Sequence, residues 1–104
     1  MTRRSPRSWN RQDSVLVLAA YFEHGMPRDM ERQRIANVLG MPVDAVVRRF
    51  HAYQSLERGE GGPAREAKLW ALYHEDRLAC LLEADEITEE RRRLPYHLKK
   101  RLQP

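Results

Sequence analysis

Residues 41–53 read MPVDAVVRRFHAY, and this stretch decides the fold. Pro42 suits the first position of a helix, where the N–H that proline lacks has no helical partner. Apolar side chains then recur at helical spacing, and two arginines stand side by side among them. The pattern predicts a helix over residues 42–56 with one apolar face. That face is formed by Val43, Val46, Val47, Phe50 and Tyr53.

Two more helices are predicted upstream of this stretch. The first runs from about Asn10 to His24; Asn10 or the nearby Ser8 can cap its start, and Gly25 marks its end. The second runs to about Leu39, with Asp29 as its cap. A tight glycine-containing turn then leads into the third helix, which makes a helix-turn-helix pattern.

Downstream, the sequence RGEGGP at residues 58–63 is the sharpest compositional break in the chain. Beyond it, Ala64 to Ala84 is predicted as one long helix whose apolar side chains are too numerous to leave in water. Thr88 can cap the next segment, ITEERRRL, which Pro95 interrupts, and PYHLKKRL is predicted to resume as a short basic helix.

The predicted fold is all-α, with a homeodomain-like three-helix unit followed by one long helix and a short C-terminal helix. Residues 1–8 are predicted to be a mobile basic arm, and residues 9–58 the three-helix unit. Residues 64–104 are predicted to be a helical extension. We expect the extension to pack on the three-helix unit or to form a homodimer through residues 64–94.

Charge narrows the class of partner. The 104 residues carry a formal net charge of +4, and residues 1–11 contain four arginines and no acid. Such basicity suits nucleic acid or an acidic protein. The single cysteine, Cys80, is typical of a reducing compartment, and no apolar run approaches the ~20 residues of a membrane span. We therefore expect a cytoplasmic protein without a membrane partner.

The segments SWNRQDSVLVLAAYFEHG and RIANVLGMPVDAVVRRFHAY resemble Myb/SANT-like members of the homeodomain-like family, and they are similar to modules that precede some HNH-type nuclease domains. The resemblance covers residues 8–56. It implies a three-helix fold and DNA binding, although some SANT-type modules bind protein tails instead. The matching residues are Trp9, Asp13, Leu16, Ala20, Tyr21, Gly25, Ile35, Ala36, Leu39, Gly40, Val46, Arg49 and Phe50.

The leading hypothesis is a small DNA-binding protein, a transcriptional regulator or accessory factor. Helix 42–56 would enter the major groove, where long donors read base edges and small residues let the backbone approach. The arm would lie along the minor groove, which attracts arginine. Arg49 suits either a phosphate contact or an internal ion pair. The candidate contacts are Ala45, Arg48, Arg49, His51, Ala52, Arg3, Arg4, Arg7, Arg11 and Arg34.

The second hypothesis is a protein-binding adaptor or inhibitor of bacterial or phage type, which would block a host nuclease, polymerase or defence complex. Its interface would use Trp70 and Tyr73, with the arginines facing an acidic protein surface; alternatively, both aromatic residues close the core. No catalytic motif is present, and the histidines and the lone cysteine have no metal-ligand spacing. We therefore expect neither an enzyme nor a metal or cofactor site.

Overall fold

The computed structural model describes the backbone of residues 8–102 and the side chains of residues 8–92. Within that range the chain forms five α-helices and no strand, which confirms the predicted all-α class. None of these helices is long and apolar enough to cross a bilayer. The arm predicted over residues 1–8 lies outside the described residues except for Ser8. The helices are α1 (Arg11–His24), α2 (Asp29–Leu39), α3 (Val43–Glu57), α4 (Ala64–Tyr73) and α5 (Arg77–Leu102).

The first two helices begin at side-chain caps. The Asn10 side chain accepts from the Asp13 N–H at 3.0 Å, and the Asp13 carboxylate accepts from the Asn10 N–H at 2.9 Å, so each satisfies a donor that the helix cannot. At α2, Glu31 accepts from the Arg28 N–H at 3.1 Å. The prediction that Asp29 caps α2 was wrong, because this bond makes Arg28 the capping position and Asp29 the first helical residue.

The connection between α2 and α3 consists of Gly40, Met41 and Pro42. Gly40 has φ 69°, a left-handed conformation that glycine adopts without steric cost. This lets the Met41 N–H donate to the Ala36 carbonyl at 3.0 Å and satisfy the end of α2. Pro42 then turns the chain into α3, one residue before the helix begins.

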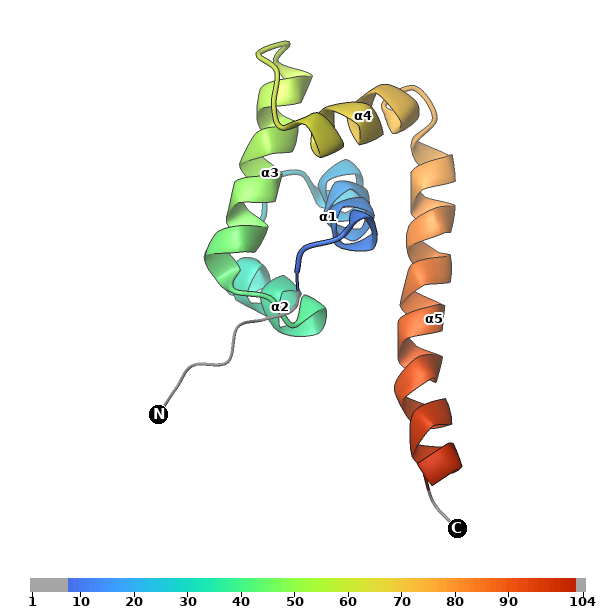
Figure 1. Cartoon of the computed structure of the whole chain (residues 1–104). Coiled ribbons are helices and arrows are strands. Elements are labelled where there is room, and N and C mark those ends of the chain that lie inside the picture. Colours follow the sequence, from blue (N-terminus) through green and yellow to red (C-terminus); the bar gives the residue numbers. More distant parts are fainter. Residues whose placement is uncertain (1–7, 103–104) are drawn as a thin grey trace.

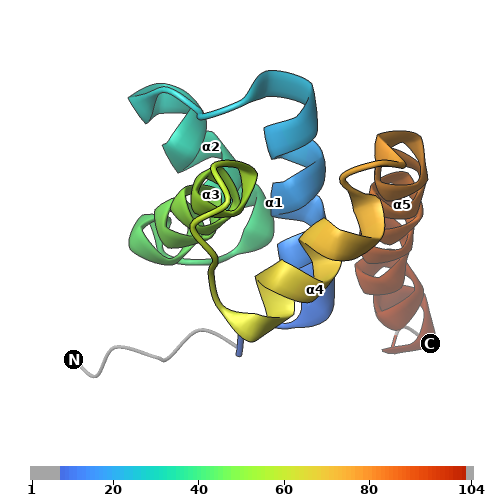
Figure 2. The same ribbon diagram turned by 90° about the horizontal axis from the view of Figure 1, so that it is seen from above.

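Helix α1 lies in the middle of the molecule. In Figures 1 and 2, α2 and α3 flank it on one side, α5 lies on the other, and α4 crosses from α3 to α5. Most of the large, fully buried apolar side chains come from α1 and α3, and α5 adds Cys80, so these three helices share one core. The buried side chains include Val15, Leu18, Phe50, Tyr53 and Cys80.

The C-terminal extension differs from the prediction. A break at residues 74–76 divides the predicted long helix, and α5 then runs unbroken through Thr88 and Pro95. Asp76 causes the break in part, since its carboxylate accepts from the Ala79 N–H at 3.3 Å and so begins a new helix. Thr88 is no cap; its hydroxyl donates to the Ala84 carbonyl within α5 at 2.8 Å. The far end of α5 extends beyond the other helices (Figure 1).

Candidate nucleic-acid interface

The outward face of α3 presents Arg48 and His51, both exposed, and Arg58 follows at its C-terminal end. The opposite face carries Val46, Phe50 and Tyr53 into the core, which fixes the direction of the outward side chains. Within the described part of the chain, no carboxylate forms an ion pair with Arg48, His51 or Arg58. Two of the predicted contacts, Arg48 and His51, are therefore available to an anionic ligand.

Arg49 lies at the edge of this face and turns toward the chain itself. Its Nε atom is 3.4 Å from a Glu66 carboxylate oxygen, and its guanidinium lies over the Trp9 ring at 4.7 Å from the centroid. Only 26% of the Arg49 side chain is exposed. Of the two roles considered for Arg49, the structure shows the internal ion pair rather than a guanidinium presented to DNA.

A buried network surrounds this ion pair. Glu66 is 2% exposed and accepts from the Ser14 hydroxyl at 2.6 Å, and that hydroxyl accepts from the Trp9 indole N–H at 2.7 Å. Tyr53 donates to the Ser14 carbonyl at 2.9 Å, and burial raises the pKa of its phenol. The network joins α1, α3 and α4 to Trp9. It therefore holds Trp9, the residue that follows the N-terminal arm, beside α3.

The two small residues of the predicted interface are half-buried. The backbone of Ala52 lies close to the linker that follows α3. A Cβ added to Gly62 would be 3.5 Å from the Ala52 carbonyl oxygen. Ala45 lies two turns N-terminal to Ala52 and one turn before Arg49, on the same edge of the helix as Arg49.

Carboxylates interrupt the basic surface at the start of α3. Asp44 and Arg48 line a shallow groove together with Asp29 and Arg32 of α2, and Arg32 forms an ion pair with Asp29 at 3.3 Å. Carboxylates repel phosphate, so these two acids disfavour a nucleic acid over the first turn of α3. The middle and the C-terminal half of the helix lack such acids on the outward face, because the next acid, Glu57, accepts a hydrogen bond from Tyr21 of α1.

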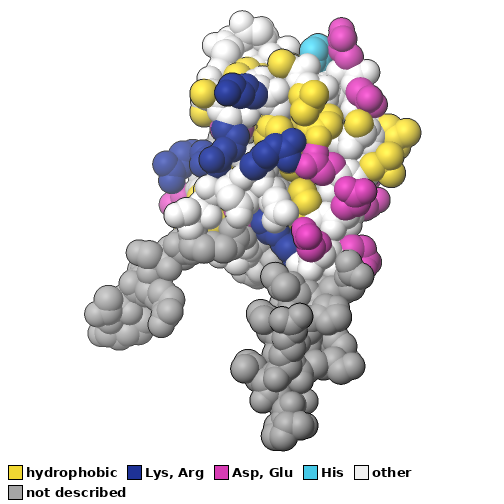
Figure 3. All heavy atoms as spheres, turned by 45° about the vertical axis from the view of Figure 1, so that its right-hand side comes forward, with side chains coloured by type: hydrophobic (Ala, Val, Ile, Leu, Met, Phe, Trp, Pro, Cys, Tyr) yellow, Lys and Arg dark blue, Asp and Glu magenta, His cyan; other side chains and the backbone are white. Residues whose placement is uncertain are grey.

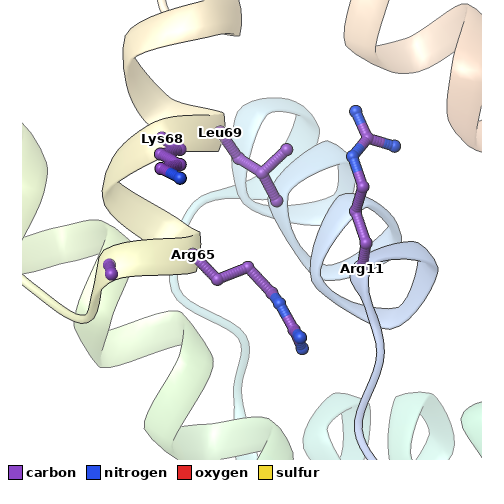
Figure 4. A pocket seen from close by; sticks show the side chains of 5 residues that line it. Arg11, Arg65, Lys68 and Leu69 are labelled. Carbon is purple, nitrogen blue, oxygen red and sulfur yellow. The ribbon is translucent and has the colours of Figure 1, made fainter.

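A second basic feature, missed in the sequence, lies at the start of α4. Arg65 and Lys68 are exposed and line a groove of about 290 Å³ between α4 and the start of α1 (Figure 4). Arg65 also donates to the Trp9 carbonyl at 3.1 Å, which places it beside the start of the arm. The sequence signal was two cations three residues apart in the first turns after Pro63, where helical spacing puts them on one face.

Arg11 borders the same groove but points away from it (Figure 4). Its Nη1 atom lies 2.5 Å from a Glu83 oxygen on α5, and Tyr73 also donates to that carboxylate. The Arg11 hydrogen bond lowers the pKa of Glu83 below its usual range. Arg11 therefore connects α1 to α5, and its charge is already paired with a carboxylate although 49% of its side chain is exposed.

Within the range that the structure describes, none of the other predicted arginines is seen on the outward face of α3. Arg34 lines a groove between α1 and α2 with His24 and Ile35, whereas Arg48 lines the groove on the other side of α2. Arg3, Arg4 and Arg7 lie outside the described residues. The structure thus presents Arg48 and His51 together on α3, places Trp9 at Arg49 on the edge of that helix, and separates Arg34 from them.

Charge is segregated over the surface. Figure 3 shows Lys and Arg side chains gathered on one part of the visible face and Asp and Glu along another. The acidic part includes a shallow groove along α5, and residues 83–90 contain five carboxylates and no base. A polyanion is therefore attracted to the α3–α4 side and repelled by the middle of α5.

Trp70 and Tyr73 do not form the exposed aromatic patch of the second hypothesis. Tyr73 is 8% exposed, and Trp70 packs against Phe22 and stacks on His74 with centroids 5.6 and 5.8 Å apart. Both rings close the core beneath α4, because this side of α4 faces α1. The large exposed apolar residues include Met30, Val38, Leu72, Leu78 and Leu82 instead.

Among the described residues, no three His, Cys, Asp or Glu side chains are placed to hold a metal ion. Burial raises the pKa of the Cys80 thiol to about 12, so this cysteine is unreactive at neutral pH. Comparisons with protein-family models, with curated proteins and with solved structures found no match to this chain.

Proposed function

We propose that residues 9–58 form a homeodomain-like helix-turn-helix unit of the Myb/SANT type, and that the chain binds double-stranded DNA through α3. One observation carries the proposal. The buried network of Trp9, Ser14, Glu66 and Arg49 holds Trp9, which directly follows the arginine-rich arm, at the edge of the helix that exposes Arg48 and His51. The arm and the helix then reach adjacent grooves of one duplex.

The position of the acids refines the contact. Asp29 and Asp44 disfavour the first turn of α3, so the duplex would meet residues 48–58 and the cations of α4, Arg65 and Lys68. Arg48 supplies a donor long enough for a base edge, and Arg65 and Lys68 supply phosphate contacts. Binding needs no chemical step; occupancy of DNA would serve a transcriptional regulator or accessory factor.

Replacing Arg48 with alanine should weaken DNA binding about tenfold or more, because one arginine contact to a base or phosphate is worth ~1–3 kcal/mol. Arg34→Ala is the matched control, since Arg34 is also exposed but lies on the other side of α2. Its affinity should stay within about twofold of the unaltered protein, because surface substitutions away from a contact have small effects. Fluorescence anisotropy with labelled duplex of random sequence at low salt measures both values.

Two results would overturn the proposal: no detectable binding by the unaltered protein at low salt, or equal losses for Arg48→Ala and Arg34→Ala. The circular dichroism spectra of both variants establish that the helices are retained.

A second function, the adaptor or inhibitor, is favoured by a different observation. Leu16, Ile35 and Val38 line a groove of about 380 Å³ between α1, α2 and α5, and 78% of Val38 is exposed. Exposed apolar surface of this kind marks protein contacts. A protein partner would then dock there and not on Trp70 and Tyr73. This function would be favoured if the unaltered chain does not bind DNA and the Val38→Lys variant no longer captures a protein that the unaltered chain captures.

A further inference from the structure

The outer side of α5 faces away from the body of the protein. Leu78, Leu82, Asp85, Glu89 and Arg92 are all exposed. Their spacing of three or four residues places them on one face of the helix, opposite the buried Cys80, Ala84 and Ile87. With 26 residues, α5 is ~39 Å long, so this face is long enough to pair with another helix.

Charge is divided lengthwise along α5. Residues 83–90 contain five carboxylates and no base, and residues 91–101 contain six bases and no acid. Two parallel copies of the helix would bring acid against acid and base against base. On the outer face itself the described charges are Asp85, Glu89 and Arg92, because Glu83 and Arg91 pair with Arg11 and Asp13 of α1. Two antiparallel copies would bring Asp85 of each against Arg92 of the other.

We propose that the chain forms a homodimer through its outer α5 face, with the two helices antiparallel. In this register Asp85 lies opposite Arg92 of the second copy. The twofold axis passes near Glu89, whose own carboxylate is 3.5 Å from Arg92 of the same helix. The face is complementary to itself, which identifies a second copy as the occupant.

The bodies of the two copies lie on the outside of the helix pair, because α1 packs on the opposite face of α5. The dimer therefore leaves both α3 faces uncovered, and it stands whether or not α3 binds DNA. Since the contact has few apolar residues and many exposed charges, dimerisation should weaken as salt rises.

Charge exchange at one pair tests the register. Asp85→Arg and Arg92→Asp should each raise the dimer dissociation constant about tenfold, because two symmetry-related exposed pairs turn from attraction to repulsion. The double variant restores opposite charges and should restore dimerisation to within about threefold of the unaltered protein. Glu60→Arg changes the net charge by as much as Asp85→Arg does and should leave dimerisation unchanged. Sedimentation velocity of the full chain over a concentration series measures all four.

Any of three results would overturn the proposal. The first is an unaltered chain that sediments as a monomer at concentrations up to about 100 μM, the range in which weak dimers form. The second is a single variant that dimerises as well as the unaltered chain. The third is a double variant that dimerises as weakly as the single variants, which would exclude the antiparallel register.

Discussion

Replacing Glu66 with alanine is expected to lower the free energy of unfolding by about 3 kcal/mol, the lower end of the range for breaking a buried ion pair. Glu66 is 2% exposed and accepts from Ser14 at 2.6 Å, while Arg49 lies 3.4 Å from it. Removal of the carboxylate leaves the Arg49 guanidinium without its partner in a largely buried place. It also leaves the Ser14 hydroxyl without its acceptor.

Urea denaturation followed by circular dichroism measures this loss. Glu60→Ala, in the exposed linker, removes a carboxylate without a buried partner and should change stability by less than about 0.5 kcal/mol. Adding Arg49→Met to Glu66→Ala should recover part of the loss, because methionine needs no counter-charge. Equal stability of Glu66→Ala and Glu60→Ala would contradict the role of the network.

Replacing Arg3, Arg4 and Arg7 together with glutamine is expected to cause the largest loss of DNA affinity. Each arginine that neutralises a phosphate contributes ~0.9 to the slope of log affinity against log salt concentration, so three should contribute ~2.7. The Arg49 guanidinium lies over the Trp9 ring at the edge of α3, so the residue that follows the arm lies next to the helix proposed to bind DNA.

The matched control replaces the same three arginines with lysine. Lysine keeps the positive charges, so the salt slope should remain while glutamine lowers it. Anisotropy titrations at several salt concentrations give both slopes. An unchanged slope in the glutamine variant would show that the arm does not contact phosphate.

Much of the helix pattern was accessible from the sequence because local signals define it. Asn10 and Gly25 bound α1, and Gly40 and Pro42 set the turn into α3; each acts through its own backbone or side-chain chemistry. The break between α4 and α5 escaped prediction because His74, Glu75 and Asp76 contain neither glycine nor proline. The only signal was Asp76, which can cap a helix as readily as it can lie within one.

The sequence predicts only those features of the candidate site that depend on a single helix. The outward direction of Arg48 follows from the burial of Val46 and Phe50 on the same helix. The fate of Arg49 depends on Glu66, which is 17 residues away in the sequence and belongs to α4. Arg11 likewise meets Glu83 from α5. Such partners come from tertiary packing, which the spacing of residues along one helix does not specify.

We propose that α3, the start of α4 and the arm form one DNA-binding face. An NMR titration of the ¹⁵N-labelled chain with a short DNA duplex at low salt tests this most directly. We expect the largest amide shifts in residues 48–58 and 64–68, where Arg48, Arg65 and Lys68 lie, and little change in the acidic stretch 83–90. Shifts confined to α5 or to the groove around Ile35 and Val38, or no shifts at all, would contradict the claim.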